Sequence, residues 1–348
     1  MQVRPLGRTG QSVSLICLGT MTYGDQNSAA EAFEQMDYAL ENGVTFFDTA
    51  ELYSSPPKPD TAGSTERIIG DWFKARGTRA QIFLASKVVG RSGMTWFRDA
   101  GGPTHLNRAQ MTEALEKSLK RLKTDHIDLY QLHWPERSIT WGSNPTVFQP
   151  SPADETTTFA EQIDVLDGFV KAGKIRWYGL SNESAWGTMR FVAESDRLNL
   201  PRPQSIQNAY SLLNRTFETG LGEVAMREQI GLLAYSPLAQ GYLSGKYQNG
   251  ALPAGSRKAL YNRLQRYEKP GSAQAIDKYV ALARESGLDP SQMALAFVNS
   301  RPFTTSTIIG ASTMAQLKLA IGSASVAITP DIEARINEIH QLHLNPAS

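Results

Sequence analysis

The chain has 348 residues, which is long for one ordinary domain but usual for a single α/β barrel with insertions. Its 35 lysines and arginines nearly balance its 34 aspartates and glutamates, so the overall charge argues against a nucleic acid or an acidic membrane surface as a partner. The single cysteine, Cys17, excludes an intramolecular disulfide framework and, with the lack of a long apolar segment, predicts a cytoplasmic protein.

The first predicted elements are two short extended pieces around Arg8, Thr9 and Gly10, which favour a β-hairpin that caps one end of the fold. Beyond them, short apolar segments alternate with longer segments that have apolar residues at helical spacing. The strand candidates are residues 15–20, 45–50, 82–87, 127–133, 175–182, 204–208, 231–236 and 305–311. The helix candidates are residues 28–41, 66–76, 108–123, 159–171, 185–196, 220–228, 274–285 and 314–320, with two further helices at 288–302 and near 330–341.

About eight units of strand and helix favour closure into a (β/α)8 TIM barrel, because an open doubly wound sheet usually has fewer strands. No second domain is indicated, so residues 1–348 are predicted to form one barrel domain. Three long segments, residues 90–107, 135–158 and 237–271, each follow a predicted strand directly. Loops in that position build the active-site face of a barrel, and loops of this length usually carry function.

Nearly every predicted strand ends in a polar residue or glycine, and these ends converge on one mouth of a barrel. The strand ends are Gly19, Thr20, Asp48, Lys87, His133, Ser181, Asn182, Gln207, Tyr235, Ser236 and Gly310. Taken singly, Asp48 is more often a helix cap and His133 more often a core histidine whose hydrogen bonds are satisfied. Tyr53, in the loop after Asp48, is by itself more often a packing residue.

Taken together, Asp48, Tyr53, Lys87 and His133 have a common chemical logic. A free tyrosine hydroxyl titrates at about pH 10, so we expect a nearby Lys87 to lower the pKa of Tyr53 and Asp48 to hold Lys87 charged and oriented. His133, kept neutral by the cationic lysine, would donate a hydrogen bond to a substrate oxygen. The set therefore predicts reduction of a carbonyl group.

These residues resemble the aldo-keto reductases, a family of (β/α)8 barrels with a catalytic tetrad of Asp, Tyr, Lys and His. The motifs that carry the resemblance are "FFDTAELY", "LASKV" and "DLYQLHWP", followed in the family's order by "GKIRWYGLSN", "IQNAYSLLNR", "LLAYSPLAQGYLSGKY" and "IIGASTMAQL", with "LGTMTYG" ahead of them. The resemblance covers nearly the whole chain. Within the family, the chain is similar to the bacterial Tas-type reductases and, more distantly, to potassium-channel β subunits. It implies that Tyr53 is the general acid, that Asp48 and Lys87 tune it, and that His133 positions the carbonyl.

The resemblance also implies a nicotinamide cofactor that donates a hydride from C4 of its ring. Ser181, Asn182 and Gln207 would hold the carboxamide, and Tyr235 would stack under the ring. The other implied cofactor residues are Gly19, Thr20, Met21 and Asp48 beside the cofactor, Ser236, Leu238, Gln240, Gly241 and Lys246 over the pyrophosphate, and Gly310, Ser312 and Gln316 at the adenosine end.

NADPH is preferred over NADH, because Ser312, Thr313 and Lys246 offer hydrogen bonds and charge to a 2′-phosphate. Leu319 and Ala320 stand where relatives often have an acidic or amide residue followed by Asn, so the family's adenine contacts are not carried over to these two positions.

The predicted substrate is a small carbonyl compound. Tyr23, Trp96 and Trp134, with Trp141 and Phe148, would form an apolar slot for aromatic or aliphatic aldehydes and ketones, or about half of them would pack the loops on themselves. No cluster of arginines indicates a site for phosphorylated sugars, but a loop arginine such as Arg91, Arg98 or Arg137 could still serve. No metal site is predicted, and the oligomeric state is left open.

Two other functions are consistent with the same fold. The chain could hold NADPH tightly as a sensor or regulatory subunit with little turnover, as the channel β subunits suggest. It could also be a Schiff-base aldolase that uses Lys87, which would require a depressed lysine pKa rather than a lysine held charged by Asp48.

Overall fold

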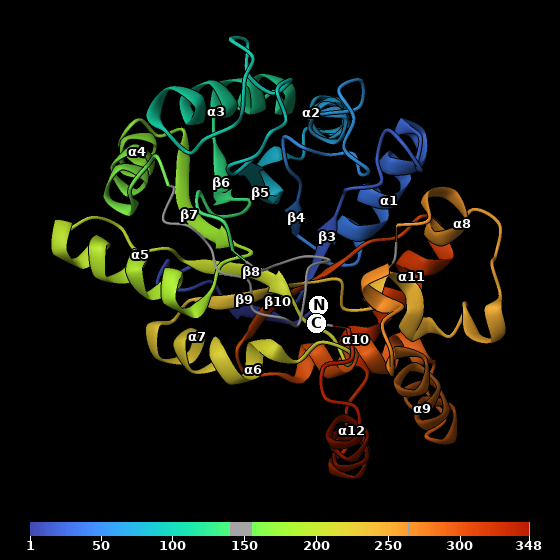
Figure 1. Cartoon of the computed structure of the whole chain (residues 1–348). Helices are drawn as coiled ribbons and strands as arrows, with labels where there is room; N and C mark the ends of the chain where they lie inside the picture. The colour runs from blue at the N-terminus through green and yellow to red at the C-terminus, as the bar shows by residue number, and fades with distance from the viewer. Residues whose placement is uncertain (140–154, 264, 348) are drawn as a thin grey trace.

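The computed structural model describes residues 1–139, 155–263 and 265–347 (Figure 1). Its centre is a closed barrel of parallel strands in the order β10-β3-β4-β5-β6-β7-β8-β9. The strands are β3 (Ile16–Gly19), β4 (Phe46–Asp48), β5 (Phe83–Val88), β6 (Ile127–Leu132), β7 (Ile175–Ser181), β8 (Ser205–Ala209), β9 (Gly231–Tyr235) and β10 (Thr304–Ile309). This barrel and the helices around it confirm the predicted (β/α)8 fold.

The helices form a ring outside the strands, as Figure 1 shows along the barrel axis. They are α1 (Ala29–Glu41), α2 (Ser64–Arg76), α3 (Arg108–Leu122), α4 (Phe159–Lys171), α5 (Ala185–Leu198), α6 (Thr216–Gly220), α7 (Gly222–Glu228), α9 (Ser272–Glu285), α10 (Pro290–Ser300), α11 (Met314–Gly322) and α12 (Pro330–Leu342). Capping boxes begin α1 at Ser28 and α4 at Thr158, as their sequences favour. The helix predicted at 220–228 is present as α7, and the short helix α6 before it was not predicted.

The N-terminal hairpin closes the end of the barrel at which the strands begin. It consists of β1 (Val3–Pro5) and β2 (Ser12–Ser14), which pair in antiparallel orientation. Leu6 and Val13 of the hairpin are buried in one cluster with Phe46 and Phe83, the first residues of β4 and β5. The hairpin predicted to cap one end of the fold is therefore confirmed, and the opposite end of the barrel is left for the site.

Loops after the strands surround that opposite end. The loop over residues 90–107 is closed at its base by an antiparallel bridge between Ser92 and Thr104. Residues 237–271 are more ordered than a plain loop, with η2 (Ala239–Ser244), η3 (Gln248–Gly250), α8 (Arg257–Tyr261) and η4 (Gln265–Tyr267). Most of the loop predicted at residues 135–158, namely residues 140–154, lies outside the described residues.

Candidate active site

Strand alternation places the functional side chains inside the barrel. Phe46 and Ala85 belong to the apolar cluster in the barrel interior, while Phe47 and Leu84 belong to the cluster shared with the helices. Side chains two residues apart on a strand face the same way, so Asp48 and Lys87 follow their interior neighbours at the end of each strand. The polar residues that end β4 and β5 therefore cap the apolar interior of the barrel.

Lys87 is the centre of the site. Its Nζ donates hydrogen bonds to Asp48 Oδ2 at 2.6 Å, to the Thr49 carbonyl at 2.8 Å and to Tyr53 Oη at 3.3 Å. The ring of His133 meets the ring of Tyr53 edge to face, with 5.7 Å between the ring centroids. The structure thus brings all four predicted tetrad residues together.

Two amide side chains fix the other oxygen of Asp48. Gln207 Nε2 donates to Asp48 Oδ1 at 2.8 Å, and Gln131 Nε2 donates to the same oxygen at 3.2 Å. Gln207 was predicted to hold the cofactor carboxamide, and in this structure its amide nitrogen is bound to Asp48. Gln131 was missed, although the alternation within "IDLYQLH" puts it on the same face as His133.

The electrostatics keep Lys87 charged and Tyr53 protonated. Burial alone would lower the pKa of Lys87, but attraction to Asp48 and Tyr53 more than offsets it, so the pKa lies above its usual value. Burial raises the pKa of Tyr53, and the charge of Lys87 opposes this rise only in part. The predicted lowering of the Tyr53 pKa is therefore wrong, because the desolvation of the phenol outweighs the attraction of the lysine.

His133 is neutral in this setting. Burial, reinforced by the charge of Lys87, holds the pKa of His133 well below its usual range. The prediction of a neutral imidazole agrees with this direction, but burial is the larger cause. Nδ1 of His133 is buried and has no hydrogen-bond partner among the described residues.

The residues predicted to hold the carboxamide form a network beside His133. Asn182 Nδ2 donates to the His133 carbonyl at 2.9 Å, and Tyr235 Oη donates to Asn182 Oδ1 at 2.7 Å. Ser181 Oγ donates to the Gln207 carbonyl at 2.9 Å. The ends of β6, β7, β8 and β9 are therefore linked around one corner of the mouth.

The end of β3 is joined to the segment that carries Tyr53. A Cβ atom on Gly19 would lie 2.7 Å from Ile308 Cγ2, so close packing against β10 requires glycine here. Thr20 Oγ1 donates to the Asp48 carbonyl at 2.9 Å, and the Met21 carbonyl accepts from the amide of Ser55 at 2.9 Å. These three predicted cofactor residues thus line the turn next to the tetrad.

A tight turn follows β9 at the residues predicted to cover the pyrophosphate. Ser236 and Gln240 have positive φ of 53° and 56°, and the Leu238 carbonyl accepts from the amide of Gly241 at 2.8 Å. Gly241 has a φ of 100°, and a Cβ there would lie 2.6 Å from Cε of Lys246. Gln240 Oε1 is buried without a hydrogen-bond partner in the described part of the chain.

Two arginines further along this loop were not predicted. Arg257 is half-buried, burial lowers its pKa, and no carboxylate among the described residues pairs with it. Its charge also acts to lower the pKa of Tyr53, so Arg257 lies near the tetrad. Arg266 hydrogen-bonds to Tyr235. No motif marks either arginine, because the fold of the loop alone brings them to the mouth.

The predicted adenosine site lies where α11 begins. Gln316 Oε1 accepts hydrogen bonds from the amide of Ser312 at 3.0 Å and from its hydroxyl at 3.1 Å. Thr313 is the N-cap of α11, and Gly310 is exposed just before it. Ala320 is buried, so it packs against the protein interior.

The predicted aromatic slot is only partly realised. Tyr23 is fully buried and its hydroxyl donates to Gln35 Oε1 of α1 at 3.1 Å, so its placement in the slot is wrong. Trp96 is partly exposed and packs edge to face on Phe97, with 4.4 Å between centroids. Trp134 is mostly buried, and its Nε1 donates to the Arg91 carbonyl at 2.8 Å. Trp141 and Phe148 lie outside the described residues.

Two of the three candidate arginines for a phosphorylated substrate are engaged elsewhere. Arg98 is buried and makes a two-pronged ion pair with Glu51. Arg137 pairs with Glu183 and stacks over Phe159 and Trp186. Both guanidiniums are therefore already paired with carboxylates.

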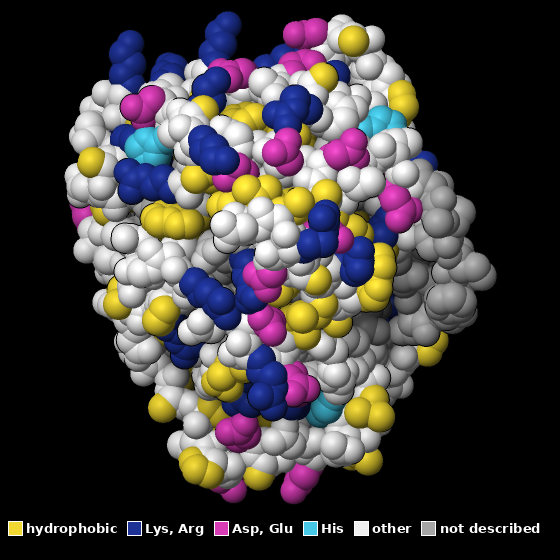
Figure 2. All heavy atoms as spheres, turned by 90° about the vertical axis from the view of Figure 1, so that its left-hand side faces the viewer, with side chains coloured by type: hydrophobic (Ala, Val, Ile, Leu, Met, Phe, Trp, Pro, Cys, Tyr) yellow, Lys and Arg dark blue, Asp and Glu magenta, His cyan; other side chains and the backbone are white. Residues whose placement is uncertain are grey.

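A cavity of about 420 Å³ lies among α4, α5 and the ends of β6 and β7. Phe159, Phe191 and Trp186 line it together with charged residues of α5. Figure 2 shows this side of the molecule, where basic and acidic side chains surround hydrophobic ones. None of the four tetrad residues lines this cavity, although Trp134 and Ser181 at the ends of β6 and β7 do.

The described residues contain no group of three or more His, Cys, Asp or Glu side chains suited to a metal ion. In the same part of the chain, none of the helices combines the length and the apolar character that crossing a membrane requires.

The comparisons with known proteins agree with this geometry. The profile of the Aldo/keto reductase family matches residues 15–341. The chain is 45% identical to "Protein tas" of Escherichia coli over 349 aligned residues that cover 100% of both chains. It is 35% identical to the "Uncharacterized oxidoreductase YrpG" of Bacillus subtilis, covering 97% of this chain and 96% of the relative. It is 29% identical to a "Probable voltage-gated potassium channel subunit beta" of Arabidopsis thaliana, covering 98% and 97%. With a barrel of parallel strands and a match over nearly its whole length, the chain belongs to the aldo/keto reductase family, and these relatives support an oxidoreductase.

Proposed function

We propose that the chain reduces aldehydes or ketones to alcohols with NADPH, and that Tyr53 is the general acid. The observation that carries this proposal is the contact of one buried ammonium group, Lys87 Nζ, with both Asp48 and Tyr53. A protonated phenol held against a fixed positive charge is suited to give up its proton and to be stabilised as the phenolate that results.

The roles of the side chains follow from this arrangement. When bound, the nicotinamide supplies a hydride to the carbonyl carbon. Tyr53 donates its hydroxyl proton to the carbonyl oxygen, and Lys87 stabilises the phenolate that remains. Neutral His133 donates a hydrogen bond to the same oxygen and fixes its direction, while Asp48 keeps Lys87 charged and in place.

Several side chains at the mouth suit the cofactor. Lys246 and Arg257 are cations without a carboxylate partner among the described residues, and NADPH brings phosphate groups for such cations to bind. Gln240 Oε1 is a buried acceptor that lacks a donor in the described part of the chain. Ser312 and Gln316 begin α11 at the place proposed for the adenosine end, where Lys246 and Thr313 support the preference for NADPH over NADH.

The substrate is proposed to be a small aromatic or aliphatic carbonyl compound. Trp96 and Trp134 lie with Tyr53 in one apolar cluster that also contains Phe97 and Val89. This cluster forms the side of the mouth next to the tetrad hydroxyl, which is where a bulky carbonyl substituent would lie. We place the enzyme in the cytoplasm.

The two other functions are distinguished by Lys87 and by turnover. A Schiff-base aldolase needs a neutral lysine, whereas Asp48 and Tyr53 raise the pKa of Lys87. A regulatory NADPH-binding subunit is favoured only by the likeness to a relative named as a channel β subunit, and it predicts binding without turnover.

The test is a fluorescence titration with NADPH and NADH, followed by steady-state turnover of a panel of aryl and alkyl aldehydes. The proposal predicts saturable binding with a preference for NADPH and one alcohol formed for each NADPH oxidised. Tight binding without turnover would favour the regulatory subunit, and no binding of either nucleotide would refute the proposal.

A further inference from the structure

A buried ion pair lies next to Tyr53 in the chain but takes no part in the chemistry derived above. Glu51 is 3% exposed and Arg98 is 4% exposed. Arg98 Nη1 donates to Glu51 Oε2 and Nη2 donates to Glu51 Oε1, both at 2.9 Å. This bidentate geometry fixes the orientation of the guanidinium as well as its distance from the carboxylate, which a single hydrogen bond does not.

The same carboxylate also fixes the end of β5. Glu51 Oε1 accepts from the amide of Val89 at 2.7 Å, and the amide of Glu51 donates to the Lys87 carbonyl at 3.2 Å. Glu51 therefore joins three parts of the site at one point. These are the segment that carries Tyr53, the strand that carries Lys87, and the loop that carries Arg98.

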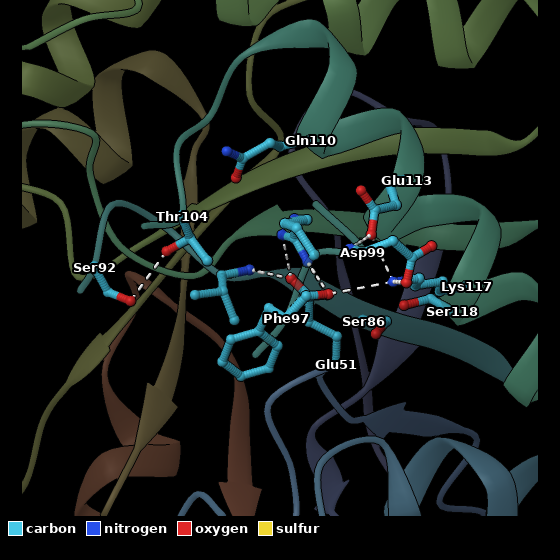
Figure 3. Close-up of polar contacts among 12 residues, drawn as sticks. Glu51, Ser86, Ser92, Phe97, Asp99, Thr104, Gln110, Glu113, Lys117 and Ser118 are labelled. Carbon is cyan, nitrogen blue, oxygen red and sulfur yellow. Dashed lines mark hydrogen bonds and ion pairs between the residues drawn. The ribbon is translucent and has the colours of Figure 1, made fainter. Parts of the chain in front are cut away.

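Several contacts anchor the loop over residues 90–107, and Figure 3 shows some of them, among them the one between Thr104 and Ser92. Thr104 closes its base through hydrogen bonds to the Gly90 carbonyl at 2.6 Å and to Ser92 Oγ at 3.0 Å. Lys117 of α3 holds the loop through Asp99 Oδ1 at 2.7 Å and through the Phe97 carbonyl at 3.4 Å. The pair of Arg98 with Glu51 is the inner anchor, on the side that faces the tetrad.

This inner anchor controls the apolar side of the mouth. Trp96 and Phe97 immediately precede Arg98, and both belong to the cluster against which Tyr53 packs. Thr104 and Asp99 lie outside this cluster, and Lys117 contacts Phe97 only through its backbone carbonyl at 3.4 Å. Loss of the inner anchor alone would let Trp96 and Phe97 shift relative to the Tyr53 hydroxyl while the loop stays folded.

We propose that Glu51 is a positioning residue that sets the selectivity of the site for bulky carbonyl substrates. Through Arg98 it holds Trp96 and Phe97 at a fixed place beside the Tyr53 hydroxyl. The inference rests on the proposed carbonyl reduction and extends it to a residue outside the tetrad. Glu51 acts through the loop and does not touch the substrate.

A second buried pair offers a matched control. Glu66 of α2 is fully buried, accepts from Ser86 Oγ at 2.5 Å and from Arg121 Nε at 2.7 Å. Like the first pair, it joins neighbouring elements through a buried carboxylate and a guanidinium, although the Arg121 side chain is 19% exposed and that of Arg98 only 1%. Neither member of this pair belongs to the cluster around Tyr53.

The experiment compares wild type, Glu51→Gln and Glu66→Gln in the full chain. For each protein, kcat and KM are measured with 4-nitrobenzaldehyde and with propanal, together with the Kd for NADPH and the thermal midpoint. Both variants are expected to lose stability, because each leaves a guanidinium without its carboxylate. Only Glu51→Gln is expected to lower the ratio of kcat/KM for the aryl aldehyde to kcat/KM for propanal. The expected decrease is on the order of tenfold and arises mainly from KM, since a small misplacement of a substrate costs up to about 100-fold in rate.

The outcomes separate the inference from the proposed function. If the ratio of the two kcat/KM values is unchanged in Glu51→Gln, or changes equally in Glu66→Gln, the positioning role of Glu51 is overturned. The proposed carbonyl reduction is not affected by that result. If Glu51→Gln does not fold, Arg98→Lys keeps the charge but loses the two-pronged contact, and it is expected to shift the ratio in the same direction; no shift would overturn the inference. A wild type that neither binds NADPH nor reduces either aldehyde would overturn the proposed function and, with it, the inference.

Discussion

Replacing Lys87 by methionine removes the charge on which the proposed mechanism depends. The ammonium lies 3.3 Å from Tyr53 Oη, and two unit charges at that distance interact by about 5 kcal/mol at an effective dielectric constant of about 20, as an upper estimate. Without it the phenolate is less stable, so Tyr53 becomes a weaker acid. We expect kcat for carbonyl reduction to fall by about 10²- to 10⁴-fold, the usual contribution of a positioned general acid.

The pH dependence of kcat shows whether Lys87 lowers or raises the pKa of Tyr53. Reduction needs protonated Tyr53, so the rate falls at alkaline pH as the hydroxyl ionises. Lys87→Met raises the pKa of Tyr53 still further, because the attraction that opposes the effect of burial is gone. The alkaline limb of kcat against pH should therefore move to higher pH while the plateau falls. This is measured from NADPH consumption with a saturating aryl aldehyde over a series of buffers.

The control for stability is the double variant Asp48→Asn with Lys87→Met. The single variant leaves Asp48 buried and without its cation, which costs about 3–5 kcal/mol in comparable ion pairs. The double variant removes the stranded charge and should regain much of this stability without regaining activity. An alkaline limb that stays in place or moves to lower pH in Lys87→Met, or activity that returns in the double variant, would refute the role of Lys87.

Two further predictions concern the cofactor and acid stability. Arg257→Gln should raise the Kd for NADPH by about 10- to 100-fold, since a hydrogen bond to a charged group contributes about 1.5–3 kcal/mol; Lys258→Gln is the control because Lys258 already pairs with Glu268, and equal Kd values would exclude Arg257 from the cofactor site. Burial holds the pKa of His133 well below its usual range. Below about pH 6.5 the unfolded chain therefore takes up a proton that the folded chain does not. As the pH is lowered through this range, the free energy of unfolding should fall by about 1.4 kcal/mol per pH unit. His133→Asn should lose this contribution, and denaturant titrations at about pH 7 and pH 5 that give the same difference for both proteins would contradict it.

The sequence was most informative where strand alternation determines which way a side chain faces. Asp48 and Lys87 each end a short apolar strand, and the period of two residues puts them inside the barrel with Phe46 and Ala85. The parallel order of the strands then brings residues far apart in the chain to one end of the barrel. The tetrad was therefore predictable from local patterns and one topological rule.

Features that depend on packing beyond the strands were not predictable. Tyr23 follows β3 closely enough to suggest the mouth, but the turn there, with its amide bonded to the Thr20 carbonyl at 3.0 Å, directs the side chain into the core against Gln35. The pKa of Tyr53 was predicted with the wrong sign, because burial is a tertiary property that the neighbouring letters do not show. Arg257 reaches the mouth only through the path of the loop over residues 237–271.

The pairing of Glu51 with Arg98 was likewise not predictable from the sequence. Glu51 stands within "FFDTAELY", between the two tetrad residues of that motif, yet nothing in the motif identifies its partner. Arg98 was considered only as a phosphate ligand, because an arginine in a long loop is usually exposed. Only the folded loop shows that this guanidinium is buried and turned inward.

The most direct test of the account is Tyr53→Phe, which removes the hydroxyl oxygen and leaves the ring against His133. NADPH affinity, from fluorescence titration, should stay near the wild-type value, while kcat for aryl aldehyde reduction at neutral pH should fall by about 10²- to 10⁴-fold. Single-turnover kinetics with NADPH already bound would show whether the chemical step itself is slowed. Sustained turnover at neutral pH by Tyr53→Phe would contradict the claim that this hydroxyl supplies the proton.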